Sequence, residues 1–172
     1  MENNHLQNLK DKIVPLSEVK EFIQTWKEMG MTVGFTNGCF DLIHKGHLTY
    51  LAKAANEVDI LVLGLNSDVS VKRLKGDARP VKDEETRAMV LASMEFIEGV
   101  FIFDDETPYE LIKKVKPNIL FKGWDYDADC TDENDPKYIV GSDIVKSKGG
   151  KVMTIPFVDG HSTTKLIEKS NS

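Results

Sequence analysis

Short apolar runs alternate with amphipathic segments along most of the chain. Five runs rich in β-branched and aromatic side chains span 31–36, 60–66, 99–103, 118–122 and 151–156. Between them lie segments with helical spacing of apolar residues, near 47–57, 83–97, 107–115, 137–148 and 163–169. Short apolar runs separated by helical segments are typical of βαβ units around a parallel sheet that is buried on both faces. The pattern therefore predicts an α/β fold.

A further helix is predicted ahead of the first strand. Apolar residues recur with helical spacing between Pro15 and Met29, Ser17 is a candidate N-cap, and Gly30 is a stop signal. We expect a helix over 17–29 within an N-terminal helical extension of residues 1–30. The remaining residues, 31–172, are enough for one domain with its own core.

Composition and charge narrow the functional classes. The formal net charge is −6 and the basic residues are spread along the chain, which argues against a nucleic-acid surface but permits a small anionic ligand. Cys39 and Cys130 lack metal-ligand spacing, and the sequence does not decide whether they form one disulfide or remain two thiols. The N-terminus lacks a signal-peptide core and the longest apolar stretch, 60–65, is too short to span a bilayer. We expect a soluble cytoplasmic protein with no membrane partner.

The richest segment for chemistry is 36–47, which reads Thr-Asn-Gly-Cys-Phe-Asp-Leu-Ile-His-Lys-Gly-His. It joins the first apolar run to a helix predicted from Leu48 to Ala55. A glycine turn between a strand and a helix is where α/β folds bind phosphates, because free N–H groups and the helix dipole favour an anion there. Two imidazoles at this point add donors for charge that develops on phosphorus.

The histidine pair, His44 and His47, has alternatives. The two side chains can cap or pack, or form half of a zinc site. His5 and His161 are the remaining histidines and no thiolate cluster accompanies them, so the residues favour phosphate chemistry over metal ligation.

Several motifs of this sequence, taken in their order along the chain, resemble those of a known enzyme superfamily. The His-x-Gly-His segment resembles the motif of the nucleotidyltransferase superfamily, and 36–41 is similar to its cytidylyltransferase-like group. The match continues through Asn66-Ser67-Asp68, the Arg73 to Pro80 segment, Arg87, the Lys122 to Tyr126 segment and the Gly160 to Thr164 segment. The set resembles adenylyltransferases that make ADP-heptose from D-glycero-β-D-manno-heptose 1-phosphate, an activity often fused behind a sugar kinase. It covers about 31–169.

The resemblance implies a Rossmann-like, doubly wound fold with a mostly parallel five-stranded sheet and helices on both faces. It also assigns roles: His44, His47 and Lys75 are the implied catalytic residues, which stabilise the α-phosphate and the transition state. The implied nucleotide-binding residues are Thr36, Asn37, Gly38, Cys39, Phe40, Gly46, Asn66, Arg73, Lys122, Gly123, Ser162, Thr163 and Thr164, the last three at the β- and γ-phosphates.

The implied co-substrates are ATP and a sugar phosphate, with Mg²⁺ carried by the nucleotide phosphates rather than by protein ligands. Enzymes of this kind often form dimers or larger rings, so the resemblance is compatible with a homo-oligomer, and the sequence does not fix the oligomeric state.

Several of these residues have simpler explanations. Four cations in eight residues, Lys72, Arg73, Lys75 and Arg79, favour anion binding over a solvated basic loop because the protein is acidic. Asn66 is also a common strand-end cap, and the hydroxyls of 162–164 are common helix N-caps. Cys39 fits a small buried residue better than a nucleophile.

An acidic stretch, 125–136, interrupts the strand–helix rhythm. Its Asp125-x-Asp127-x-Asp129 spacing is that of a calcium loop, but Cys130 stands where the turn needs glycine and Pro136 where the closing Glu belongs. We therefore expect a solvated surface insertion.

Two rival functions stay open. One is a cytidylyltransferase for another phosphorylated alcohol; Phe157 and Val158 replace the Arg-Thr pair of glycerol-3-phosphate cytidylyltransferases, which speaks against that substrate. The other is a nucleotide-binding module without activity, which the presence of both histidines and Lys75 disfavours. The choice between ATP and CTP rests on the resemblance alone.

Overall fold

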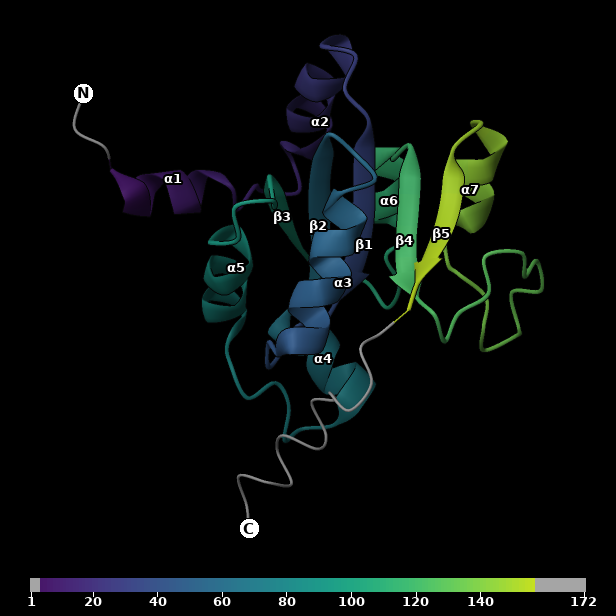
Figure 1. Ribbon diagram of the computed structural model, residues 1–172. Helices are drawn as coiled ribbons and strands as arrows, with labels where there is room; N and C mark the ends of the chain where they lie inside the picture. Colours follow the sequence, from purple (N-terminus) through teal and green to yellow (C-terminus); the bar gives the residue numbers. More distant parts are fainter. Residues whose placement is uncertain (1–3, 157–172) are drawn as a thin grey trace.

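A five-stranded parallel sheet forms the centre of the protein, and the computed structural model describes residues 4–156 of it (Figure 1). The strands are β1 (Val33–Gly38), β2 (Ile60–Asn66), β3 (Gly99–Phe103), β4 (Ile119–Gly123) and β5 (Lys151–Ile155). Their order across the sheet is β3-β2-β1-β4-β5, and every pair of neighbours is parallel. The five apolar runs are therefore confirmed as strands, and the sheet is entirely rather than mostly parallel.

The helices are α1 (His5–Asp11), α2 (Val19–Glu28), α3 (Lys45–Ala55), α4 (Asp68–Lys75), α5 (Glu84–Ala92), α6 (Tyr109–Val115) and α7 (Ser142–Ser147). The helical segments expected near 17–29, 47–57, 83–97, 107–115 and 137–148 are all present, although α5 and α7 are shorter than expected. Helix α1 lies within the helical extension expected over 1–30, although no separate helix was expected at its position, and helix α4 was not expected. The segment expected at 163–169 lies outside the described residues.

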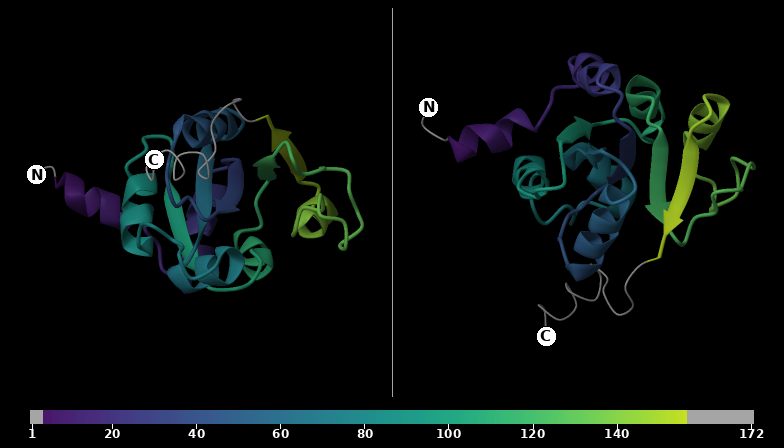
Figure 2. Two further views of the ribbon diagram at one scale, coloured as in Figure 1. Left: turned by 90° about the horizontal axis from the view of Figure 1, so that it is seen from below. Right: turned by 45° about the horizontal axis from the view of Figure 1, so that its top comes forward.

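Helices cover both faces of the sheet, as expected (Figure 2). On one face α2, α6 and α7 bury Val19, Ile23, Ile112 and Val145 against the strands. On the other face α3 and α5 bury a second set that includes Leu51 and Leu91. Because both faces are covered, the interior strand β2, which lies between β3 and β1, is buried at all seven positions. Burial of apolar side chains in these two layers stabilises the fold.

Local signals at the helix ends agree with the sequence in part. Gly30 ends the α2 segment with a φ of +76°, a conformation that glycine adopts without strain. The predicted N-cap of α2 is wrong by one residue, since Glu18 holds that position and makes no side-chain cap. Ser67 caps α4 and Asp83 caps α5, each through a side-chain oxygen that accepts a backbone N–H.

The order of the strands fixes where a ligand can bind. The chain runs from β1 outward to β2 and β3, then returns to β4 on the other side of β1. Connections after β1 and β4 therefore leave in opposite directions and open a crevice at the carboxyl ends of these two strands. Helix α4 and the starts of α3 and α5 lie around the same edge, at the bottom of Figure 1. None of the helices within residues 4–156 is long and apolar enough to cross a membrane.

Candidate active site

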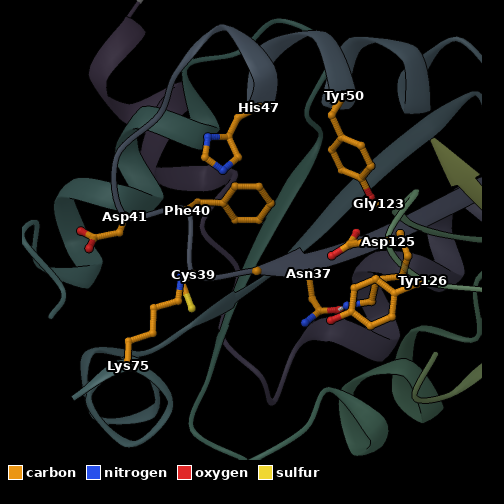
Figure 3. Close-up of a pocket in the computed structure, with 12 residues that line it drawn as sticks. Asn37, Cys39, Phe40, Asp41, His47, Tyr50, Lys75, Gly123, Asp125 and Tyr126 are labelled. Carbon is orange, nitrogen blue, oxygen red and sulfur yellow. Dashed lines mark hydrogen bonds between the residues drawn. The ribbon is translucent and has the colours of Figure 1, made fainter. Parts of the chain in front are cut away.

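A pocket of about 260 Å³ lies in the crevice between β1 and β4 (Figure 3). Lys122 bridges the two strands, since its Nζ donates to Asn37 Oδ1 at 2.6 Å. The lining residues are Asn37, Gly38, Cys39, Phe40, Asp41, His47, Tyr50, Lys75, Lys122, Gly123, Asp125 and Tyr126. The structure thus brings together eight of the predicted site residues from four separate segments of the chain.

The two histidines form the first turn of α3. His44 is the N-cap, and its Nδ1 accepts the Gly46 N–H at 3.1 Å, while His47 Nδ1 faces the His44 N–H at 3.4 Å. The ring centroids are 3.9 Å apart. Because both Nδ1 atoms face backbone donors, each ring in its neutral form carries its hydrogen on Nε2. The pair is therefore arranged as two hydrogen-bond donors at the positive end of a helix.

The environment of His47 keeps its imidazole neutral. Burial lowers the pKa of His47 to about 4, and the nearby His44 and Lys75 add to this effect. Phe40 packs edge-on against the ring, with centroids 5.6 Å apart (Figure 3). At neutral pH His47 can donate a hydrogen bond to an anion, but it does not carry a proton that it could release as an acid.

A sharp turn after β1 shapes the floor of the pocket. Phe40 has a φ of +43°, in the left-handed region that non-glycine residues rarely adopt. This turn folds the Phe40 ring back toward Gly38, where an added Cβ would meet the ring at 3.2 Å. Gly38 therefore permits both the close ring and a ligand near the backbone.

The basic segment predicted as an anion-binding loop begins within α4. Lys75 is the last residue of this helix and lines the pocket. Arg73 lies outside the lining, and its guanidinium donates to the carbonyl of Asp104. Arg79 donates from Nε to Asp41 at 2.5 Å. Of these three cations, Lys75 is the one placed to contact a ligand in the pocket.

Asp41 holds the segment that follows α4. Its carboxylate accepts Arg79 Nε and the backbone N–H groups of Val81 and Lys82, at 2.8 and 3.1 Å for the last two. Burial alone would raise the pKa of Asp41, but the hydrogen bonds from Lys82, Arg79 and Val81 outweigh it and lower the pKa below its ordinary value. Asp41 thus orients the segment that follows α4.

Arg87 is a residue whose role the sequence reasoning missed. Its side chain is 1% exposed, and Nη1 donates to the carbonyls of Cys39 and Asn66, at 2.6 and 2.8 Å. Nη2 pairs with Asp68 at 2.8 Å and Nε donates to the Lys82 carbonyl at 3.0 Å. One guanidinium therefore fastens the ends of β1 and β2 to α4 and α5. The spacing of Arg87 with Ala88 and Leu91 on one face of α5 was the signal that could have revealed it.

Two predicted residues lie behind the pocket wall. Thr36 Oγ1 and the Tyr50 hydroxyl form a buried hydrogen bond of 2.8 Å that joins β1 to α3. Burial raises the pKa of Tyr50, so this phenol stays protonated. Asn66 is buried, and its Nδ2 donates to Ser70 Oγ at 3.0 Å. Thr36 and Asn66 therefore hold neighbouring elements in place, and neither of these two residues lines the pocket.

Lys122 and Cys39 also have shifted ionisation. Burial lowers the pKa of Lys122 to about 8, and Asp125 and Cys39 oppose that shift. Burial raises the pKa of the Cys39 thiol above its ordinary value, against the effect of Lys75 and Arg87. Cys39 is therefore a thiol rather than a thiolate at neutral pH, which fits a pocket wall better than a nucleophile.

The acidic stretch after β4 folds into local turns. Asp127, Asp132 and Asp135 each accept a backbone N–H two residues further along the chain. Within residues 4–156 no cluster of three or more His, Cys, Asp or Glu side chains is placed to hold a metal ion. The stretch is largely exposed, as expected for a surface insertion. The predicted residues Ser162, Thr163 and Thr164 lie outside the described residues.

Comparison with known proteins agrees with this geometry. The chain is 49% identical over 160 residues to the bifunctional protein HldE of Paramagnetospirillum magneticum, and 49% identical over 158 residues to that of Geobacter metallireducens. These matches cover 93% and 92% of this chain but 31% of each relative, so the chain spans about a third of their length.

The fold is also found among solved structures. Pantoate–β-alanine ligase from Francisella tularensis superposes with a TM-score of 0.59 over 92% of this chain and 77% of that one, at 12% identity. At this identity the likeness shows the fold alone, which is the Rossmann-like arrangement expected from the sequence. The profile of the cytidylyltransferase-like family matches residues 35–169, from β1 to beyond β5. The chain therefore belongs to the cytidylyltransferase-like family.

Proposed function

We propose that this protein transfers AMP from ATP to a sugar 1-phosphate, D-glycero-β-D-manno-heptose 1-phosphate, and gives ADP-heptose and pyrophosphate. The observation that carries the proposal is His47 in the first turn of α3, which lines a pocket that also contains Lys75. His44 caps the same end of α3 outside the pocket lining, with its ring centroid 3.9 Å from that of His47. The near 50% identity to proteins named HldE supports the choice of ATP and heptose phosphate over other pairs.

The transfer needs no covalent enzyme intermediate. An oxygen of the sugar phosphate attacks the α-phosphorus of ATP, the bond from that phosphorus to the bridging oxygen breaks, and pyrophosphate leaves with the electron pair. Catalysis is then positioning together with stabilisation of the negative charge on the transferred phosphoryl group. His44 and His47 donate to oxygens of the α-phosphate, and Lys75 places a positive charge beside them.

Two further features belong to the proposal. ATP enters as its Mg²⁺ complex, with the ion on the phosphates, because Mg²⁺ in such sites is bound largely by substrate oxygens and water. Ser162, Thr163 and Thr164 are proposed to bind the departing pyrophosphate, as the resemblance implies.

Pyrophosphate release tests the proposal. The enzyme is assayed with ATP and with CTP, each against heptose 1-phosphate, glycerol 3-phosphate and phosphoethanolamine. We expect turnover with ATP and heptose 1-phosphate well above that of the other five pairs. A preference for CTP or for glycerol 3-phosphate would replace the proposed substrates by those of a cytidylyltransferase, and no release from any pair would refute the proposed reaction.

A further inference from the structure

The pocket has two ends with different chemistry. At one end lie His47, Lys75 and the N-terminus of α3, which attract the phosphates of a nucleotide. At the other end lie Asp125 and Tyr126, in the loop that follows β4 (Figure 3). Lys122 of β4 belongs to this end, because its Nζ lies 5.3 Å from the centroid of the Tyr126 ring. The comparisons give no role to this second end.

The geometry of phosphoryl transfer relates the two ends. The attacking and leaving oxygens lie roughly in line on opposite sides of the phosphorus. Because the cations and the helix N-terminus at the first end attract the triphosphate, the acceptor must approach from the second end.

Lys122 is fixed in a position suited to a phosphate group. Its Nζ donates to Asn37 Oδ1 at 2.6 Å and lies 5.3 Å from the centroid of the Tyr126 ring. The side chain is half-buried and is held by both contacts before any ligand binds. Because the Lys122 ammonium is already ordered, binding an anion costs little side-chain entropy, and Lys122 is preorganised to bind a phosphate group.

Asp125 adds a negative charge at the same end. Within the described part of the chain the Asp125 carboxylate has no hydrogen bond or ion pair. The other carboxylate of the lining, that of Asp41, already accepts hydrogen bonds from Arg79 and from two backbone N–H groups. A carboxylate repels phosphate and accepts hydrogen bonds from hydroxyls. An ammonium group on the acceptor would be attracted to Asp125 but repelled by the adjacent Lys122. The combination therefore selects hydroxyls beside a phosphate.

We propose that Lys122 and Asp125 form the acceptor subsite, in which Lys122 binds the acceptor phosphate and Asp125 binds neighbouring hydroxyl groups. The substrate class is then a phosphorylated polyol, and Asp125 is the residue that determines this specificity. The inference rests on the proposed function for the nucleotide end of the pocket. It moves Lys122 from the nucleotide, where the resemblance placed it, to the acceptor.

Steady-state kinetics test the role of Asp125. The variants are Asp125→Ala, Asp125→Asn and the control Asp129→Ala, which removes an exposed carboxylate of the same loop that does not line the pocket. A hydrogen bond to a charged group contributes about 1.5–3 kcal/mol, so Asp125→Ala should raise KM for heptose 1-phosphate about 10- to 150-fold. KM for ATP should stay within about twofold of the wild-type value. For Asp125→Asn, KM for heptose 1-phosphate should lie between the values of the wild type and of Asp125→Ala. The control Asp129→Ala should match the wild type in both KM values. An unchanged acceptor KM, or an equal rise in both KM values, would overturn the subsite.

Direct binding separates the subsite from the reaction. Calorimetry measures heptose 1-phosphate, glycerol 3-phosphate and phosphoethanolamine on the wild type and on Asp125→Ala, with and without α,β-methylene-ATP. We expect the wild type to prefer the two polyol phosphates and Asp125→Ala to lose that preference. This result supports the subsite even if ATP yields no pyrophosphate, which would refute the proposed reaction only. Equal affinity for all three compounds, a preference for phosphoethanolamine, or no binding at all would overturn the subsite.

Discussion

Arg87→Ala should cost more stability than the removal of any exposed cation. The substitution leaves three buried or half-buried carbonyls, of Cys39, Asn66 and Lys82, without their donor, and leaves Asp68 without its ion pair. Removing one partner of a buried ion pair costs about 3–5 kcal/mol, and each orphaned buried acceptor about 1–3 kcal/mol. Water can reach Asp68, whose side chain is 32% exposed, so the total destabilisation is smaller than the sum of these separate costs. We expect a loss of about 3–5 kcal/mol.

Urea unfolding measures this loss through the fluorescence of Trp26, which packs against the core. The free energy of unfolding follows from the midpoint and the slope. The matched control is Arg73→Ala, which removes an exposed guanidinium with a single bond to a carbonyl and should cost below about 1 kcal/mol. Arg87→Lys keeps the charge but cannot reach four acceptors, so it should fall between the two. A loss for Arg87→Ala as small as that of the control would refute the assigned role.

Two further predictions concern ionisation. His47 should stay neutral from pH 8 to pH 5 and titrate near pH 4, as seen in the Cε1–H resonance, and bound ATP should raise its midpoint because phosphate favours the imidazolium; a midpoint near 6.5 without ligand would contradict this. Lys122 loses its proton as the pH rises through about 8, so KM for the acceptor should increase above pH 8, by up to about tenfold per pH unit, and Lys122→Arg should delay this increase. A constant acceptor KM from pH 7 to 9.5 would contradict the assignment.

Elements that bury an apolar face could be predicted from the sequence. The strands are continuous apolar runs because helices cover both faces of the sheet, and α2, α3 and α6 show their buried residues at helical spacing. Helix α1 buries none of its residues, so no apolar stripe marks it. Helix α4 is mostly polar, and its start depends on the Ser67 cap, which is also ordinary turn chemistry.

Local parts of the site were predictable for the same kind of reason. The turn after β1 and the histidines at the start of α3 are contiguous in sequence, so their chemistry is visible there. The contact of Asn37 with Lys122 joins residues 85 positions apart, and it depends on β4 lying beside β1. Periodicity does not give the order of strands. The contacts of Arg87 and the place of Asp125 in the lining depend on the tertiary structure in the same way.

The central claim is that the two histidines at the start of α3 stabilise charge during nucleotidyl transfer. His47→Ala removes one donor from the pocket. His44→Asn removes the other Nε2 donor but keeps a side chain that caps helices well, so α3 should remain intact. Circular dichroism and the urea midpoint serve as controls for folding.

The measurement is kcat for pyrophosphate release from ATP and heptose 1-phosphate in the wild type and in both variants. Loss of one donor to a transition-state oxygen typically costs about 10²–10³ in kcat, so each variant should fall by at least about 100-fold while its fold is retained. Near-normal turnover in both folded variants would contradict the account.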